Sequence, residues 1–548
     1  MTTEINYSVS PNGEKFPLPT DAEYTLEIER LEKLVAEQRQ MERKIVVVMG
    51  VGFVGAVMAG VVADSVSKET GEPLYYVIGM QRPSIRSYWK IPLINRGLSP
   101  VEAEDPEVAP MIERCVREKQ TLTATFSDAV LALADVVVVD VQCDYQKETF
   151  GDVRKGSADI AALEESLKTI GERIDPGCLV LIETTVPPGT TEYIANPIMK
   201  KEFAKRSIAA EPLLSHSFER VMPGRDYVAS IRDFWRVCSG INADAREKVV
   251  EFLSNVLNVD KFPLTVLDRP MESETCKIVE NSYRATLLAF MDEWSVFSER
   301  NGVDITKVIQ AIKTRPTHSN MLFPGPGIGG YCLPKDGGLG VWSYHTLMGF
   351  EDNLFKITPE AININDTRSL RAARMTRDAL RNMSKIVPSS KIAILGASYR
   401  EDVGDTRYSG SEIIVRKIAE MGGEVTVHDP YLKRWLEFEK QDTYPAPGQS
   451  WARFFRNQEP LSELKVSETL EDTLKGVDAV ILAVRHQVYL ELTPDEVVNL
   501  TGGPVAVIDC FALLDDDKIR RYFELGCEVK GLGRGHVKRI KDGVNEKK

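Results

Sequence analysis

Strand-like and helix-like segments alternate in two separate stretches of this 548-residue chain, and this alternation limits the fold more than any other feature. In the first stretch, four short runs rich in β-branched residues are predicted to be buried strands: KIVVVMG, PLYYVIGM, ADVVVVDVQ and GCLVLIETTV. Helical patterns such as PEVAPMIERCVREKQ and ADIAALEESLKTIGERI lie between them. Strands that alternate with helices form a parallel, doubly wound sheet.

The alternation returns over about residues 388–535, after a helical middle. KIAILGASYR, GEVTVHDPY, VDAVILAVRH and PVAVIDCFALL predict the strands of a second such sheet. In between, MESETCKIVENSYRATLLAFMDEWSVFSERNG predicts one long helix, of the kind that carries a domain junction or a dimer interface. The expected fold class is α/β, with two Rossmann-like doubly wound domains joined by a helical central dimerisation region.

Residues 20–43 predict an amphipathic helix, because Tyr24, Ile28, Leu31 and Val35 recur at helical spacing among charged residues. We expect it to pack on its own domain or on a neighbouring subunit rather than to bind a membrane.

Charge and cysteine usage narrow the function. A net charge of −13 argues against a nucleic-acid partner, although a small anionic ligand needs only local donors. The eight cysteines are scattered without a CxxC pair, which indicates reduced thiols in a cytoplasm and argues against a disulfide framework or a metal site. No apolar run has the length of a membrane helix, of about 20 residues, and the N-terminus lacks a signal-peptide core, so no membrane partner is expected.

The first strand leads into Gly50-Val51-Gly52-Phe53-Val54-Gly55, which has the spacing of a dinucleotide-binding fingerprint. The first glycine permits the tight turn, the second lets the backbone approach a pyrophosphate, and the third lets helix and strand pack closely. Because the turn lies between a predicted strand and a predicted helix, we expect it to bind a cofactor rather than to be only a structural turn.

The next strand ends differently from the usual fingerprint. Gln81 stands where an acidic residue normally holds the adenosine ribose. Its amide can still hydrogen-bond a ribose hydroxyl, so NAD is the expected cofactor. Arg82 and Arg86 are also suited to a 2′-phosphate, so NADP stays open as the alternative.

Some polar residues suit a site but also have ordinary structural explanations. Thr184 and Thr185 close a strand at the ligand-binding edge of the sheet, where a plain strand ending is equally natural. Lys277 and Asn281 share one helix face, yet a solvated lysine is the simpler interpretation, and the same applies to Glu219.

The segment PGPGIGGYCLPKD presents Cys332 in a glycine-rich loop rather than in an apolar strand or helix. The residues that follow it can begin a helix with Pro334 in the first turn. A thiol at a helix N-terminus beside a lysine has a lowered pKa and becomes a nucleophile. The glycines indicate that the backbone closely approaches a ligand.

Together these segments make the chain resemble the UDP-glucose/GDP-mannose dehydrogenase family, the nucleotide-sugar 6-dehydrogenases, over about residues 44–540. Eight blocks occur in the family's order: GVGFVG, INRGLSP, TTVPPGT, ERVMPG, CKIVEN, GPGIGGYCLPKD, GDTRYSG and VHDPY. The resemblance implies an N-terminal helical extension (1–43), an NAD-binding domain (44–244), a central helical domain with the cysteine loop (245–385) and a UDP-binding domain (386–548).

The resemblance also implies an NAD-dependent, four-electron oxidation of a C6 alcohol to a carboxylate. Cys332 matches the nucleophile that forms a thiohemiacetal and then a thioester. Lys277 and Asn281 match the pair that stabilises charge on the C6 oxygen. Asp336 and Thr185 match the residues that hold the water used for base chemistry and hydrolysis.

Other family contacts are implied by position. Glu219 matches the glutamate of a PE motif, and Arg407 would reach the substrate, in the neighbouring subunit's site. The implied cofactor contacts are Gly50, Gly52, Phe53, Val54, Gly55, Gln81, Arg82, Cys143, Thr185 and Lys335. The implied substrate contacts are Glu219, Lys277, Asn281, Phe323, Gly329, Arg400 and Arg407.

Three departures from the family pattern affect binding more than chemistry. Phe218 replaces the proline of the PE motif, VQCDY replaces a Thr-Pro step, and Arg400 replaces a lysine. The expected substrate is UDP-glucose or a UDP-N-acetylhexosamine, and the expected assembly is a homodimer or larger homo-oligomer. A GDP-mannose dehydrogenase, a one-step hydroxyacid-type dehydrogenase and a non-catalytic nucleotide-sugar-binding protein are the alternatives.

Overall fold

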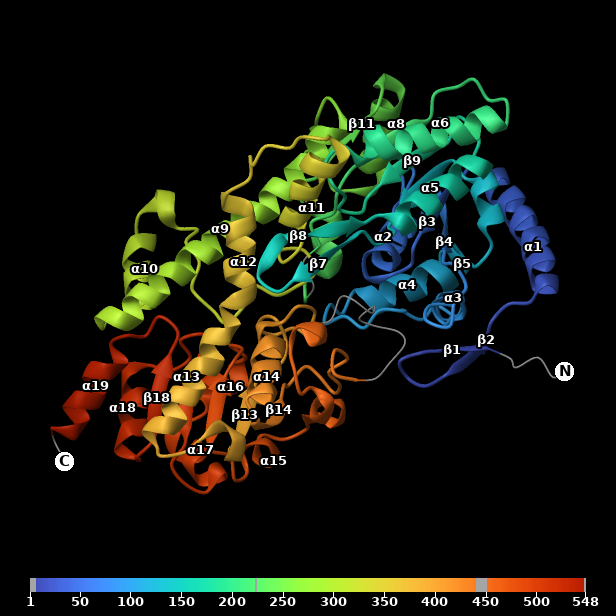
Figure 1. Ribbon diagram of the computed structural model, residues 1–548. Coiled ribbons are helices and arrows are strands. Elements are labelled where there is room, and N and C mark those ends of the chain that lie inside the picture. The colour runs from blue at the N-terminus through green and yellow to red at the C-terminus, as the bar shows by residue number, and fades with distance from the viewer. Residues whose placement is uncertain (1–5, 222–223, 440–450, 547–548) are drawn as a thin grey trace. The chain divides into compact units, whose positions relative to one another are not determined.

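The structure is a computed structural model that describes residues 6–221, 224–439 and 451–546. The chain divides into two compact units, coloured by residue number in Figure 1. Unit 1 comprises Met1–Asp144, Ala158–Ile278 and Trp342–Phe350, and unit 2 comprises Tyr145–Ser157, Val279–Val341 and Glu351–Lys548. Each unit contains one Rossmann-like sheet, which confirms the predicted fold class.

The sheet of unit 1 has eight strands in the order β12-β11-β10-β9-β6-β3-β4-β5, all parallel except for the β10–β11 pair. The four strands predicted from the sequence are adjacent and form its centre: β9 (Leu179–Ile182), β6 (Val136–Val139), β3 (Lys44–Met49) and β4 (Tyr75–Met80). The other strands are β5 (Leu122–Thr125), β10 (Leu213–His216), β11 (Val237–Gly240) and β12 (Thr265–Val266).

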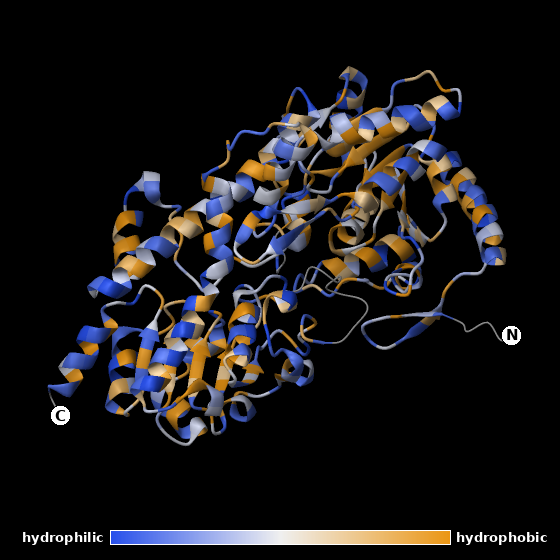
Figure 2. Cartoon of the chain, viewed as in Figure 1, coloured by the Kyte–Doolittle hydropathy of each residue, from blue (hydrophilic) through white to orange (hydrophobic). Residues whose placement is uncertain are grey.

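Helices cover both faces of this sheet. Val46 and Val48 of β3 join the apolar cluster that includes Met111 of α4 and Phe252 of α8, while the alternate residues of β3 are buried on the other face. Figure 2 shows the strands as mainly hydrophobic and the helices as two-faced. The helices are α2 (Phe53–Asp64), α3 (Lys90–Asn95), α4 (Val108–Arg117), α5 (Ala161–Arg173), α6 (Asn196–Lys205), α7 (Tyr227–Arg232) and α8 (Ala243–Val256).

The predicted N-terminal helix is α1 (Asp21–Gln40), opened by a capping box between Thr20 and Glu23. Its Leu31 and Val35 side chains are buried within unit 1, so the helix packs on its own domain. A two-stranded hairpin that the sequence did not suggest, β1 (Tyr7–Val9) with β2 (Lys15–Pro17), precedes it.

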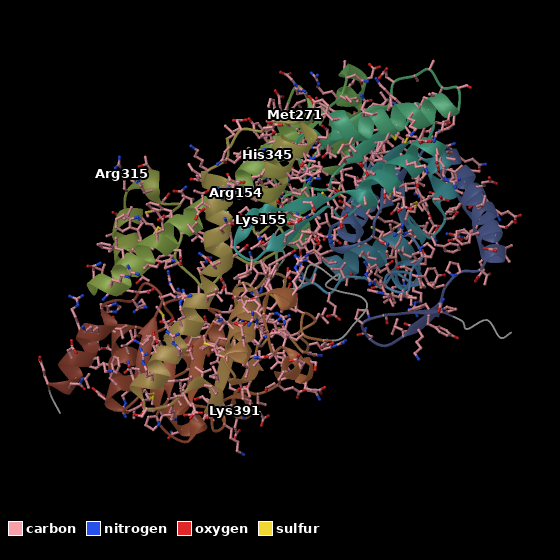
Figure 3. The ribbon with its side chains drawn as sticks, in the orientation of Figure 1. Arg154, Lys155, Met271, Arg315, His345 and Lys391 are labelled. Atoms are coloured by element: carbon pink, nitrogen blue, oxygen red, sulfur yellow. The ribbon has the colours of Figure 1, made fainter. Side chains whose placement is uncertain are left out.

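The sheet of unit 2 has six parallel strands in the order β15-β14-β13-β16-β17-β18. Its first strand begins at Lys391, which Figure 3 labels. Ile392 and Ile394 pack into the apolar cluster of one face, and Ala393 and Leu395 into that of the other, so this sheet is also covered on both sides. The strands are β13 (Lys391–Leu395), β14 (Glu424–His428), β15 (Val466–Ser467), β16 (Ala479–Leu482), β17 (Ala506–Asp509) and β18 (Glu528–Gly531).

The predicted long helix is α9 (Pro270–Asn301), which begins in unit 1 and continues into unit 2. The other helices of the central region are α10 (Ile305–Lys313), α11 (Asp336–Trp342), α12 (Ile357–Thr367) and α13 (Ser369–Asn382). The helices along the second sheet are α14 (Gly410–Glu420), α15 (Leu470–Leu474), α16 (Gln487–Glu491), α17 (Pro494–Thr501), α18 (Asp516–Glu524) and α19 (Val537–Asn545). Among the described residues, no helix is both long and apolar enough to span a membrane.

A polar hairpin, β7 (Asp144–Thr149) with β8 (Asp152–Asp159), packs mainly with unit 2. Its Lys147 pairs with Asp366 at 2.5 Å, and the ring of Phe150 lies 5.3 Å from that of Trp451. Arg154 and Lys155, labelled in Figure 3, are exposed on β8.

Candidate active site

The glycine turn between β3 and α2 has room for a ligand at one position only. A Cβ on Gly50, whose φ is +99°, would lie 2.5 Å from the carbonyl oxygen of Asp140, and one on Gly55 would lie 2.0 Å from that of Gly50. A Cβ on Gly52 would meet no atom within 4 Å. Gly50 and Gly55 therefore close the turn, while Gly52 leaves the N-terminus of α2 open to a pyrophosphate, as the predicted fingerprint requires.

The residue at the ribose end of the predicted cofactor site, Gln81, has an uncharged side chain. Gln81 follows β4, is half-buried, and donates its side-chain amide to the Ser87 hydroxyl at 3.3 Å. Arg82 is largely exposed and pairs with Glu165 at 3.0 Å. A 2′-phosphate would have to compete with Glu165 for Arg82, so this geometry favours NAD over NADP.

A buried carboxyl group that the sequence analysis missed lies beside the glycine turn. Asp140 follows β6, and its Oδ2 atom lies 3.1 Å from the position of a Cβ on Gly55. Burial and, to a smaller extent, the charge of Glu219 raise the pKa of Asp140 to about 7, while Arg236 opposes them. The predicted cofactor residue Cys143, three positions on, is also buried. An acidic residue directly after the VVVV strand was the available signal for Asp140.

Lys277 is not a solvated lysine. Its side chain is buried, and its ammonium group donates to the Glu219 carbonyl oxygen at 2.8 Å and lies 3.9 Å from the carboxylate. The ammonium also lies 5.3 Å from the ring centre of Phe218, the residue that replaces the family's proline. The Glu219 carboxylate in turn accepts from the Val221 backbone. Two residues of ERVMPG, Met222 and Pro223, lie outside the described residues.

The start of α9 is anchored by buried groups. Glu274 accepts from the Gly189 and Thr191 backbones at 2.6 and 2.8 Å, which ties α9 to the loop that follows β9 and the buried Thr185. His216 lies 2.7 Å from the Ser273 hydroxyl, and burial lowers its pKa to about 3. These contacts hold α9 in place about one helical turn before Lys277.

In unit 2, the cysteine loop leads directly into α11. Cys332 is half-buried, and its carbonyl oxygen accepts from the Lys335 and Asp336 backbones at 3.1 and 3.0 Å. The helix begins at Asp336, slightly later than the sequence suggested. The Asp336 carboxylate accepts from Lys335 and from Asn281, both at 2.6 Å. Three predicted residues therefore form one buried polar cluster beside the cysteine.

The glycines of this loop approach the chain's own residues closely. A Cβ on Gly325 would lie 2.5 Å from the Phe511 ring, one on Gly327 would lie 2.7 Å from Gly410, and one on Gly329 would lie 2.3 Å from Tyr399. At these positions the loop packs closely against the second Rossmann-like domain, and the approach of its glycines, Gly329 among them, to a ligand stays a prediction.

Arg407 lies beside the cysteine loop of its own chain. Its guanidinium is 5.6 Å from the Tyr331 ring centre and pairs with Asp405 at 2.6 Å, and its carbonyl oxygen accepts from the Gly330 backbone. Tyr399 packs on Gly329 of the same loop. Burial and Asp405 raise the pKa of Tyr399 to about 12, Cys332 raises it as well, and Arg400 and Arg407 lower it.

The predicted residues thus form two groups, each within its own unit. Lys277 and Glu219 form one group in unit 1, and the cluster beside Cys332 forms the other in unit 2. Lys277 and Asn281 lie one turn apart on α9. Phe323, a predicted substrate contact, is 42% exposed and lies near Lys313.

Comparison with known proteins identifies three domain models of one family along the chain. The UDP-glucose/GDP-mannose dehydrogenase family's NAD binding domain matches residues 44–256, its central domain 271–367 and its UDP binding domain 393–516. A UDP-N-acetyl-D-mannosamine dehydrogenase of Pyrococcus horikoshii is 26% identical over 496 residues, which cover 90% of this chain and all of that protein.

A solved structure also resembles the whole chain. It is the NDP-N-acetyl-D-galactosaminuronic acid dehydrogenase of Methanosarcina mazei, with 26% identity, a TM-score of 0.70, and coverage of 93% of this chain and 98% of that one. The structure of the Pyrococcus horikoshii UDP-D-ManNAc dehydrogenase has a TM-score of 0.71 at 23% identity, which supports the fold.

Proposed function

The chain belongs to the UDP-glucose/GDP-mannose dehydrogenase family and is an NAD-dependent nucleotide-sugar dehydrogenase; from that premise we propose that it oxidises C6 of a UDP-N-acetylhexosamine to the carboxylate. UDP-N-acetylmannosamine is the first candidate, because the Pyrococcus relative acts on it, and UDP-glucose is the second. The cluster of Asn281, Lys335 and Asp336 beside Cys332 is the observation that carries this proposal.

Cys332 is the proposed nucleophile. NAD would be held at the Gly52 turn and would accept the hydride in both oxidations. After the first oxidation, the Cys332 thiolate adds to the C6 aldehyde and forms a thiohemiacetal; the second oxidation converts it to a thioester. Water then attacks the thioester carbon, and the thiolate leaves. Overall, the alcohol and one water molecule are converted to the carboxylate. Two hydrides are transferred and three protons are released.

Lys277 is proposed to stabilise the negative charge that develops on the C6 oxygen. Its buried ammonium group binds the Glu219 carbonyl oxygen at 2.8 Å, so an oxyanion would be an equally short and more strongly charged acceptor. Asn281, one turn further on α9, is proposed to assist it.

Asp336 is proposed to position and deprotonate water, with Thr185 assisting. One oxygen of its carboxylate accepts from Asn281 and the other from Lys335, so the group is oriented by two donors. Arg407 is proposed to bind substrate phosphate and Arg400 to assist it. The family resemblance implies that Arg407 acts in the neighbouring subunit's site, whereas its packing on Tyr331 supports a role in its own chain.

A homodimer through α9 is the proposed assembly. An exposed apolar stripe runs along this helix at helical spacing, and it consists of Val279, Tyr283, Phe290, Trp294 and Phe297. Each of these side chains is between 45 and 59% exposed. A second copy of the same helix is the natural partner for such a self-complementary stripe.

We also propose that three domains begin at residues 44, 245 and 386 and that the protein is located in the cytoplasm. None of the eight cysteines, all of them among the described residues, forms a disulfide, which suits a reducing compartment. The product would then be available there as a precursor for polysaccharide synthesis.

The proposed function is tested by following NADH and NADPH formation with UDP-N-acetylmannosamine, its gluco and galacto isomers, UDP-glucose and GDP-mannose. Two NADH for each UDP-sugar consumed is the expected result. One NADH for each sugar would instead indicate a single-step dehydrogenase. Sugar binding without turnover would indicate a non-catalytic protein, and preference for GDP-mannose would overturn the choice of nucleotide.

A further inference from the structure

Three helices of unit 2 begin around one cavity of about 670 Å³. Asp304 caps α10, Asp516 is the first residue of α18, and His536 directly precedes α19. A backbone bridge between Asp304 and Arg534 holds the first and last of these segments together. None of the residues that line the cavity has a role in the proposed oxidation.

The side chains of Asp304, Asp516 and His536 bring their donor atoms together. His536 Nε2 lies 3.0 Å from Asp516 Oδ1 and 3.5 Å from Asp304 Oδ2, and one ligand atom from each residue lies within 4.8 Å of the others. Two bonds of 2.0–2.1 Å at a tetrahedral angle place their donor atoms about 3.3 Å apart. The observed separations bracket that value.

Each carboxylate has one oxygen held by the protein and the other turned toward His536. Asp304 Oδ1 accepts from the Thr306 backbone and hydroxyl at 3.0 and 2.6 Å, and Asp516 Oδ2 accepts from Lys307 at 2.6 Å. Such contacts orient the ligands of metal sites in proteins.

One inner oxygen of this cluster lacks the hydrogen bond that buried polar groups normally make, while His536 Nε2 and Asp516 Oδ1 are 3.0 Å apart, within hydrogen-bond distance of each other. Asp304 Oδ2 is buried without a hydrogen-bond partner in the described part of the chain, it lies 3.5 Å from His536 Nε2, and both side chains are only 5% exposed. An unpartnered carboxylate oxygen that is buried and faces an imidazole nitrogen is a strong indication of a missing ligand.

The donor types favour zinc over calcium or magnesium. Calcium and magnesium sites are built from oxygen donors, whereas imidazole with carboxylates suits zinc and its neighbours. Two cations border the site, because Lys307 binds Asp516 and Arg534 Nε lies 3.6 Å from Asp304 Oδ1. They offset part of the charge of the two carboxylates, so the choice of metal rests on the donor types.

We propose that Asp304, Asp516 and His536 form a three-ligand site for a divalent transition metal of the zinc class, with a fourth position open to the cavity. Asp304 lies more than 200 residues before Asp516 and His536, and the ligands include no cysteine, so the scattered cysteines, which argued against a metal, do not bear on this site. The metal would clamp α10 to the starts of α18 and α19.

Zinc binding to the full-length chain tests this proposal, measured by equilibrium dialysis and elemental analysis. A Cys332→Ala background removes the half-buried Cys332 thiol as a competing ligand. Asp304→Asn is the matched variant, because asparagine still caps α10 while it weakens the metal ligand. His536→Gln is the second variant, and His318→Gln controls for a histidine outside the cluster.

We expect the parent and His318→Gln each to bind one zinc ion tightly per chain. We expect Asp304→Asn and His536→Gln to lose this zinc ion. Zinc should raise the thermal midpoint of the parent and leave those two variants unchanged. Two results would overturn the proposal. One is equal zinc uptake by all variants, and the other is no uptake by the parent at a free zinc concentration about 100 times a micromolar Kd. The visible spectrum of the cobalt-loaded parent is a test that requires no comparison with a variant. Intense bands of tetrahedrally coordinated cobalt are expected, and their absence counts against the site.

Discussion

Asn281 donates its side-chain amide to the Asp336 carboxylate at 2.6 Å, which connects the middle of α9 to the first residue of α11. Lys335 binds the other oxygen of the same carboxylate at 2.6 Å. Both donors fix the carboxylate directly after the loop that presents Cys332. The central helix and the cysteine loop therefore share one polar contact on which the proposed hydrolysis depends.

Replacing Asp336 by asparagine should lower kcat by about 10²–10⁴-fold, the usual contribution of a positioned acid–base group. KM should change much less, because the shape of the side chain is retained. Steady-state NADH formation measures both values. The exposed Asp268→Asn is the matched control, and an unchanged kcat in Asp336→Asn would refute the assigned role.

Cofactor choice should respond to Glu165, which pairs with Arg82 at 3.0 Å. Glu165→Ala frees Arg82 to meet a 2′-phosphate, and kcat/KM with NADP should rise by about two- to fivefold, as expected for loss of an exposed ion pair. The value with NAD should stay constant. Glu164→Ala is the control, and equal responses of the two variants would show that Arg82 takes no part in the discrimination.

Assembly should depend on the apolar stripe of α9. Trp294→Glu places a charge on a 45% exposed aromatic position and should convert the homodimer to a monomer. Light scattering after size-exclusion chromatography measures the mass. Ile386→Glu, at a 63% exposed position outside α9, is the control. A wild-type monomer, or a dimer that survives Trp294→Glu, would contradict this interface.

Stability at acid pH should depend on His216, which is fully buried and whose pKa is lowered to about 3. An unfolded histidine takes up a proton near pH 6.5, so between these two values the unfolded state binds more protons. The contribution of His216 is therefore complete above about pH 6.5 and falls as the pH is lowered. The loss is about 1.4 kcal/mol for each pH unit.

The His216→Gln variant lacks this histidine, so its free energy of unfolding should decrease less as the pH is lowered. Between pH 6.5 and 5.0, wild type should lose about 2 kcal/mol more than the variant, measured by urea unfolding. Asp140 and Glu274, whose pKa values are raised to about 7, act in the opposite direction but cancel in the comparison. His345→Gln controls for an ordinary histidine, and parallel pH profiles of wild type and His216→Gln would contradict the account.

The sequence predicted the parts of the fold that a hydrophobic pattern can reveal. β3, β4, β6 and β9 are continuous apolar runs because both faces of a central parallel strand are buried. β5 (LTAT) and β11 (VCSG) were missed, since small polar residues fill their buried positions. The β7–β8 hairpin was missed because its residues are mostly polar.

The candidate site was predicted to a similar extent. Motif spacing and family resemblance identified Cys332, Asn281 and Asp336, and the last two do share a hydrogen bond. The burial of Asp140 and of His216 depends on contacts between distant segments, so no local pattern showed it. The packing role of Gly325 and Gly329 was likewise invisible, because Phe511 and Tyr399 come from the other Rossmann-like domain.

The most direct test of the account is uronic acid formation by Cys332→Ala with saturating UDP-N-acetylmannosamine and NAD. If Cys332 carries the sugar through its second oxidation, the variant should retain its fold and sugar binding but form acid at least about 10³-fold more slowly than wild type. Acid formation at the wild-type rate, with two NADH for each sugar, would contradict the central claim.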